Sequence, residues 1–131
     1  MRWLWRWATL AATLATVAAL PAQAGPTAPA SAAAATATVC DRAVCESVTG
    51  VGSTVYSVKV TAHPSRTACG HFTMTITTPQ TKIITNSPPV CASQPSYLFV
   101  VHQTFPVGTT IAMQFTSPLT PGRPVVRLPL R

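Results

Sequence analysis

Apolar and polar side chains alternate one by one in three separate stretches of this chain. These stretches are TVYSVKVTA (54–62), HFTMTITT (71–78) and TTIAMQFT (109–116). A period of two is typical of strands that bury one face and expose the other to solvent. The pattern therefore predicts half-buried antiparallel strands. The expected core faces comprise Tyr56, Val58, Val60, Ala62, Phe72, Met74, Ile76, Ile111, Met113 and Phe115.

Turn residues divide the chain further. In residues 105–109 (FPVGT), proline presets φ and the following glycine can adopt a left-handed conformation, so we expect 97–104 and 109–117 to form a hairpin. Both faces of 97–104 are apolar, which predicts a central strand covered on each side. The predicted strands are 43–49, 54–62, 71–78, 82–86, 97–104, 109–117 and 124–130.

Seven short strands within about 90 residues favour an all-β fold. We expect an immunoglobulin-like two-sheet β-sandwich, stapled by disulfides. A small β-barrel is the alternative. The likeness to antibody domains is one of architecture alone, because all three tryptophans lie within the first seven residues and none is available to the predicted core.

The chain contains four cysteines: Cys40, Cys45, Cys69 and Cys91. An even number predicts two disulfides in a chain that reaches an oxidising compartment, which the N-terminal segment described below indicates. Three connectivities exist for four cysteines. We favour Cys40–Cys45 with Cys69–Cys91 because both loops are local, and closing the longer one contributes about 3 kcal/mol in the chain-entropy picture. A zinc site is disfavoured, because the spacing lacks a CxxC knuckle and exported thiols oxidise.

The N-terminus has the features of a secretory signal peptide. Two arginines precede an apolar run at 8–20, and Ala22-Gln23-Ala24 supplies a small-residue cleavage point. The run is too short to span a bilayer, so we expect no membrane span after cleavage. Cleavage after Ala24 leaves seven basic and two acidic side chains, a net charge of +5. Residues 25–39, rich in Ala, Pro and Thr, are predicted to be a flexible linker to a domain at 40–131.

Basic residues recur at the C-terminal end. In an extended strand, Arg123, Arg127 and Arg131 lie on one face, about 13 Å apart. The prolines in this segment restrict it to a sheet edge or a strap, where they and the charges also discourage pairing with other chains. A sharper interpretation is a site for an anionic envelope polymer or an acidic extracellular protein. Nucleic acid suits the charge but not an exported chain, and no nucleic-acid-binding motif is present.

The residues needed for metal binding and catalysis are sparse. His63, His71 and His102 are scattered, so we expect no metal site and no cofactor. Asp41 and Glu46 lie five residues apart around the small predicted disulfide loop and are the two carboxylate side chains of the chain. No nucleophile-elbow pattern accompanies them. We therefore expect a protein that is not an enzyme.

The stretch GHFTMTI, followed by TNSP and an aromatic strand, resembles small secreted actinobacterial proteins of unknown role. The resemblance covers about residues 68–117 and implies an exported β-domain without a catalytic residue to carry over. Cys69 departs from the pattern, because those proteins often have an aromatic residue at that position.

These features lead to a functional prediction. We expect a secreted β-module that binds an envelope or extracellular partner through a basic surface. An alternative is a small inhibitor of a secreted protease, presenting the proline-stiffened loop 86–90 next to Cys91. A small hydrolase or a metal-binding protein is the second alternative.

Overall fold

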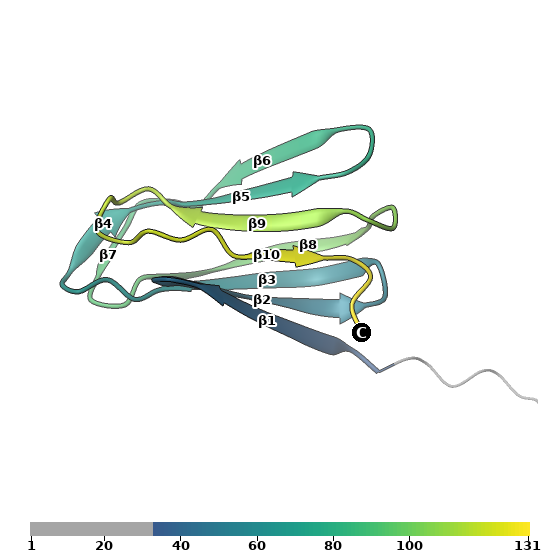
Figure 1. Ribbon diagram of the computed structural model, residues 1–131, viewed down its shortest axis with the longest axis horizontal. Helices are drawn as coiled ribbons and strands as arrows, with labels where there is room; N and C mark the ends of the chain where they lie inside the picture. Colours follow the sequence, from purple (N-terminus) through teal and green to yellow (C-terminus); the bar gives the residue numbers. More distant parts are fainter. Residues whose placement is uncertain (1–32) are drawn as a thin grey trace, which may run out of the picture. The chain divides into compact units, whose positions relative to one another are not determined.

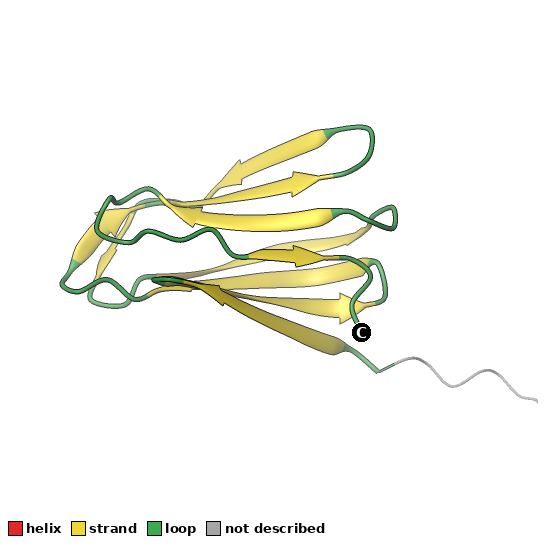
Figure 2. Cartoon of the chain, in the orientation of Figure 1, coloured by secondary structure: helices red, strands yellow, loops and turns green. Residues whose placement is uncertain are grey.

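The computed structural model describes residues 33–131 of the chain (Figure 1). Ten strands and no helix are found in this part, and loops connect the strands (Figure 2). The strands are β1 (Ala35–Asp41), β2 (Val44–Val51), β3 (Thr54–Ala62), β4 (Ala68–Gly70), β5 (Phe72–Thr77), β6 (Lys82–Asn86), β7 (Val90–Ala92), β8 (Ser96–Thr104), β9 (Thr110–Phe115) and β10 (Val125–Arg127).

Two four-stranded antiparallel sheets pack face to face around one apolar core (Figure 1). The first sheet has the order β1-β2-β3-β8 and the second the order β10-β9-β5-β6, while β4 and β7 form a separate pair. Each of the seven predicted strands is present, and the predicted β-sandwich is confirmed. Both sheets have open edges, so the closed barrel is wrong.

The alternation of side chains sets which faces form the core. Phe72, Met74 and Ile76 are at most 4% exposed, and the predicted inward residues of β9 are equally buried. The predicted inward faces of β5 and β9 are thus confirmed. Burial of such side chains stabilises the fold by about 1.5–3 kcal/mol each.

One predicted core residue, Tyr56, lies on the surface. The pairing of β3 with β8 shifts in register between Val55 and Ser57. An extra residue at such a bulge changes which side chains point inward. Val55 is therefore fully buried and Tyr56 is 37% exposed, while Val58 keeps its predicted place in the core.

The predicted hairpin between 97–104 and 109–117 is wrong. The turn itself forms, with Gly108 at a φ of 91° and the Thr109 N–H bonded to the Pro106 carbonyl at 3.2 Å. However, β8 pairs with β3 in the first sheet, whereas β9 pairs with β5 and β10 in the second. The turn therefore carries the chain from one sheet to the other.

The prediction that 97–104 is a central strand is also wrong. Strand β8 lies at the edge of its sheet, and Leu98 and Val100 are 52% and 67% exposed. Its inward side packs as a core strand should, with Phe99 only 5% exposed. Apolar residues on both faces of β8 thus indicate an exposed apolar surface rather than a second covering layer.

Both predicted disulfides are confirmed. Cys40 and Cys45 are directly opposed in β1 and β2, and Cys69 and Cys91 are directly opposed in β4 and β7. Each bond therefore joins neighbouring strands that are already paired.

The domain begins earlier than predicted. Residues 35–39, assigned to the linker, belong to β1 and pair with β2 from Ala35 onward. Hydroxyl groups reinforce this pairing, because Thr38 Oγ1 lies 2.9 Å from Ser47 Oγ. The predicted signal peptide and the linker up to residue 32 lie outside the described residues. In the part of the chain that the structure describes, no helix has the length and apolarity to cross a membrane.

A carboxyl group lies inside the core. Glu46 occupies an inward position of β2 between Val39 of β1 and Val60 of β3, and it is 0% exposed. Neither carboxyl oxygen has a partner with hydrogen-bond geometry among the described residues. Burial raises the pKa of Glu46 to about 8, and the nearby backbone amide of Val126 offsets this only in part. The side chain is therefore a neutral carboxylic acid at pH 7.

This burial makes the stability of the protein depend on pH. Glu46 keeps its proton in the folded state up to about pH 8 but loses it near pH 4.5 in the unfolded state. Its contribution to the free energy of unfolding is complete below pH 4.5 and falls by about 5 kcal/mol as pH rises to 8. We expect Glu46→Gln to remove this slope, as measured by urea unfolding at several pH values. Parallel curves for the two proteins would contradict the assignment.

Candidate functional site

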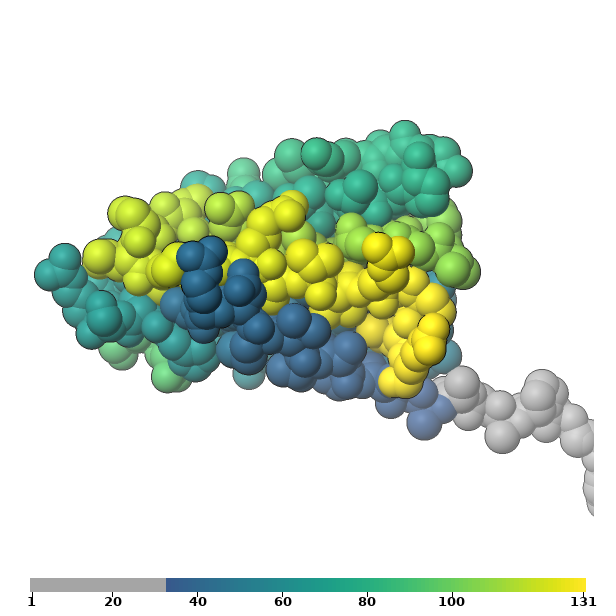
Figure 3. All heavy atoms as spheres, viewed as in Figure 1, coloured from purple at the N-terminus to yellow at the C-terminus, as the bar shows by residue number. Residues whose placement is uncertain are grey.

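The segment 121–131 runs along one side of the sandwich and is called the strap here. Pro124, Val126, Leu128 and Leu130 are buried, and the three arginines of the strap are exposed. The sheet order places β10, the central part of the strap, at an edge, which confirms the predicted edge strand. Figure 3 shows the strap (yellow) running alongside β1 (dark blue) across this face of the molecule.

Backbone hydrogen bonds join the strap to both sheets. The Leu128 N–H donates to the Thr109 carbonyl at 2.9 Å, next to β9 in the second sheet. The Leu130 N–H donates to the Gly52 carbonyl at 2.7 Å, in the turn between β2 and β3 of the first sheet. The strap therefore closes one open side of the sandwich.

Asp41 fixes the other end of the strap. Its Oδ2 accepts a 2.7 Å hydrogen bond from the Arg123 N–H, and the Ala43 N–H donates to the Pro121 carbonyl at 2.9 Å. Gly122 permits this close approach, because a Cβ there would lie 2.0 Å from the Asp41 carbonyl oxygen. Its φ of 139° is also one that other residues rarely adopt.

The hairpin turn that follows Asp41 carries a second arginine, Arg42, to the strap. Arg42 has a φ of 53°, a left-handed conformation that is unfavourable for residues other than glycine. The Cys40–Cys45 disulfide closes this turn on one side and the strap contacts it on the other. Strained backbone positions cluster at functional sites, so Arg42 is a candidate functional residue.

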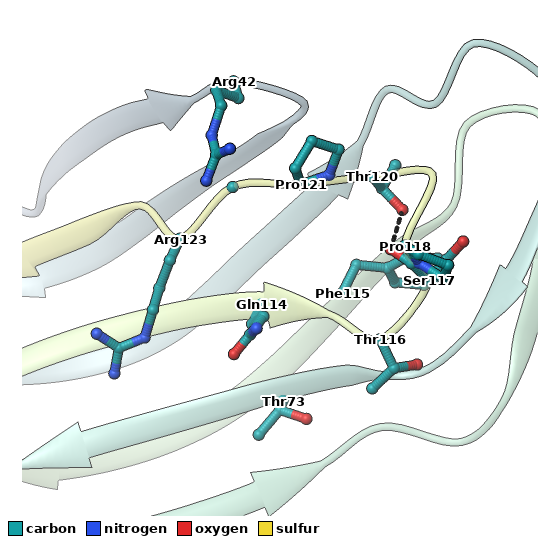
Figure 4. Close-up of a pocket in the computed structure, with 11 residues that line it drawn as sticks. Arg42, Thr73, Gln114, Phe115, Thr116, Ser117, Pro118, Thr120, Pro121 and Arg123 are labelled. Carbon is teal, nitrogen blue, oxygen red and sulfur yellow. Dashed lines mark hydrogen bonds between the residues drawn. The ribbon is translucent and has the colours of Figure 1, made fainter.

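A pocket of about 660 Å³ lies between this turn, the strap and β9 (Figure 4). Arg42 and Arg123 line one side of it, and Thr73, Gln114 and Thr116 line the other. Thr73 and Gln114 are paired across β5 and β9, and extending the β9–β10 register by two residues brings Arg123 opposite Gln114. The pocket thus combines two guanidinium groups with neutral amide and hydroxyl groups.

The strap also borders a second pocket, of about 530 Å³. Arg127 and Arg131 lie on its lining together with apolar residues of β1 and the strap. Both pockets therefore have the strap as a wall. The strap site is defined here as Arg42, Arg123, Arg127 and Arg131 with these two pockets.

The strap site carries little compensating negative charge. Arg42 Nε lies 4.0 Å from Asp41 Oδ1, and this is the only ion pair found within residues 33–131. Both side chains are substantially exposed, so the pair contributes little energy and leaves Arg42 available. Guanidinium groups bind carboxylate and phosphate oxygens through paired hydrogen bonds. The chemistry of the site thus favours an anionic ligand.

The structure does not bring the other candidate residues together. No group of three or more His, Cys, Asp or Glu side chains in residues 33–131 could hold a metal ion. His63 follows β3, His71 precedes β5 and His102 lies in β8 beside Tyr56, with ring centroids 5.9 Å apart. Asp41 accepts a hydrogen bond from the strap, whereas Glu46 is buried in the core.

The loop 86–90, which the inhibitor alternative would present to a protease, is held in place by hydrogen bonds of Ser87. This side chain is 6% exposed, and its hydroxyl accepts from the Phe72 N–H and donates to the Pro88 carbonyl, both at 2.9 Å. Asn86, Pro88 and Pro89 are exposed, whereas Ser87 between them is buried and Val90 is half-buried. The buried Ser87 thus interrupts the exposed surface of the loop.

The strap contact is testable through Asp41. We expect Asp41→Ala to lower the free energy of unfolding by about 1–2 kcal/mol, because the Arg123 N–H loses its acceptor. Asp41→Asn is the matched control, since it keeps an acceptor oxygen and should cost less than half as much. Urea unfolding and hydrogen exchange of the Arg123 amide measure both effects. Equal losses in the two variants would contradict this role.

Comparisons with known proteins found no match for this chain. No protein-family model matches this sequence. No curated protein and no solved structure matches it either. The resemblance to small secreted actinobacterial proteins therefore stays a prediction.

Proposed function

We propose that this protein is an exported, non-enzymatic module that binds an anionic polymer of the envelope or the extracellular space through the strap site. The observation that carries this proposal is the row of arginines along two open pockets. Asp41 is the one acidic side chain beside them, and its carboxylate accepts a backbone hydrogen bond from the strap.

An extended polyanion suits the shape of the strap site better than a compact anion. Strand β10 keeps the strap extended from Val125 to Arg127, and the chain bends at residues 128–129 before Arg131. Arg123 lines the first pocket and Arg127 and Arg131 line the second, so the guanidinium groups are distributed over two pockets. A polymer with a charge on every unit could contact all three groups at once. Such contacts are screened by salt, so binding should weaken steeply as ionic strength rises.

Two further features support export and a role without catalysis. Disulfides persist in oxidising compartments, which agrees with the predicted signal peptide. Hydrolysis by paired carboxylates needs two acids at one cleft. Here Glu46 is enclosed in the core and Asp41 lies at the strap. The two carboxyl groups therefore do not come together at either pocket.

Prolines and arginines along the strap also discourage edge-to-edge pairing, whether or not a ligand binds. The two roles differ in one measurable respect. Protection of an edge needs no partner, whereas a binding site produces an affinity that depends on these particular arginines.

The proposal predicts binding to long-chain polyphosphate and to poly-glutamate, but not to neutral dextran. We expect the triple variant Arg123→Gln/Arg127→Gln/Arg131→Gln to bind about 10–100-fold more weakly at low salt, because three exposed charge contacts contribute about 0.5–1 kcal/mol each. Isothermal titration at several salt concentrations measures both the affinity and its salt dependence.

A matched control removes the same amount of charge elsewhere. Lys59→Gln/Arg66→Gln/Lys82→Gln changes the net charge equally but leaves the strap site intact. We expect this variant to lose less than about threefold in affinity, because its charges lie on other surfaces. Equal losses in both triple variants would show that overall charge, rather than the strap site, attracts the polymer.

Arg42 allows binding to be separated from stability. Arg42→Gly and Arg42→Ala remove the same charge, but glycine relieves the left-handed strain and alanine does not. We expect the glycine variant to be the more stable of the two by about 1 kcal/mol. Both should bind polyphosphate several-fold more weakly than the unaltered protein. Unchanged binding in both variants would remove Arg42 from the strap site.

A further inference from the structure

Strand β6 leaves one edge of the second sheet unpaired. The sheet order β10-β9-β5-β6 gives β6 a single neighbour among the described strands, and all five residues from Lys82 to Asn86 are exposed. Figure 1 shows β6 at the border of the molecule, on the far side of its sheet from β10. This edge therefore lies opposite the strap.

The hydrogen bonds on either side of β6 show which backbone groups are free. The Ser87 N–H donates to the Phe72 carbonyl and the Thr78 N–H donates to the Thr81 carbonyl, both at 2.8 Å. Backbone bonds in an antiparallel pair recur every second residue, so Ile83 and Thr85 direct their N–H and C=O groups toward β5. The backbone groups of Lys82, Ile84 and Asn86 consequently face the open edge.

We propose that β6 pairs with β6 of a second copy of this chain, antiparallel and about a two-fold axis through Ile84. In this register Ile84 opposes its own counterpart, and Lys82 opposes Asn86 of the other copy. The three outward residues of each copy then exchange about six backbone hydrogen bonds. Lys82 meets an amide rather than a second lysine, so the register avoids a like-charge contact. A two-fold contact of one patch with itself is the usual form of a homodimer.

The other edges are blocked in ways that β6 is not. The strap carries Pro124 and Pro129 together with its arginines, which oppose further pairing. Strand β8 is interrupted by His102 at a φ of 47° and by the register shift opposite Val55. Strand β1 lies alongside the strap (Figure 3). The sequence of β6, KIITN, contains no proline and one charge.

Exposed apolar side chains surround this edge. Ile84 is 60% exposed and Ile83 is 37% exposed. A groove of about 190 Å³ separates β6 from β8, with Ile83, Phe99 and Val101 in its lining. Pairing of two β6 strands removes part of this surface from water. A five-residue pair still buries less than the roughly 1,200 Å² of stable complexes, so we expect a dissociation constant of about 100 µM.

The dimer has a consequence for the strap. Joining the second sheets through β6 produces one eight-stranded sheet with β10 at both outer edges. Neither strap site is covered, and a long polymer could engage both. Two linked sites raise the apparent affinity without any new contact to the polymer. The dimer itself does not depend on polymer binding, so either proposal can fail alone.

The test uses hydrogen exchange of individual amides by NMR, together with sedimentation, between about 20 µM and 2 mM protein. We expect the Lys82, Ile84 and Asn86 amides to exchange about fivefold more slowly at the high concentration. The Ile83 and Thr85 amides should not change, because they already bond to β5. Sedimentation should shift from monomer to dimer over the same range. A monomer throughout, with no change in exchange, overturns the proposal.

Three variants locate the contact. Ile84→Pro removes an edge-facing donor without affecting the bonds to β5, and Ile84→Lys places two charges together at the two-fold axis. We expect both to stay monomeric at 2 mM while keeping the unfolding midpoint of the unaltered protein. Val100→Lys makes the same substitution at an exposed residue of β8 and should leave the dimer intact. A dimer that survives in both Ile84 variants, or is lost only in Val100→Lys, overturns the proposal.

Discussion

Docking of the strap across one open side of the sandwich is the interaction on which the rest of the structure depends. Its buried residues, such as Leu128, complete a core to which both sheets contribute. Its backbone bonds to the Gly52 carbonyl and the Asp41 carboxylate hold it against the first sheet. The same segment forms a wall of both pockets, and the backbone of Val126 lies near the buried carboxyl group of Glu46. The packing of the core and the basic surface thus depend on one segment.

The strands were predictable because each strand follows from a local sequence pattern. Their pairing was not, because it depends on contacts between residues that are far apart in the chain. Alternation located β5 and β9 within a few residues, and short spacing identified both disulfides. The turn at 105–109 also forms as its residues require. Whether the two strands beside this turn pair with each other is decided by packing of the whole core. The residues of the turn do not determine it. The bulge beside Tyr56 is similar, since a register shift involves two strands far apart in the chain.

The residues of the strap site also differ in how far local sequence indicates them. Arg123, Arg127 and Arg131 were selected from their four-residue spacing alone, and each of them lines one of the two pockets. Arg42 was missed, since its position follows from the conformation of a turn and the docking of the strap against it. Glu46 did leave a signal: it shares the parity of Val44 and Val48, so alternation alone indicated an inward carboxyl group.

The burial of residues 124–130 also constrains the order in which the molecule can fold. In the order of the chain, every other strand of the sandwich precedes this segment. Until this segment docks, one side of the core stays open to water, and the native state lacks a major part of its apolar contacts. Folding must therefore finish late, through contacts between distant parts of the chain, which slows it.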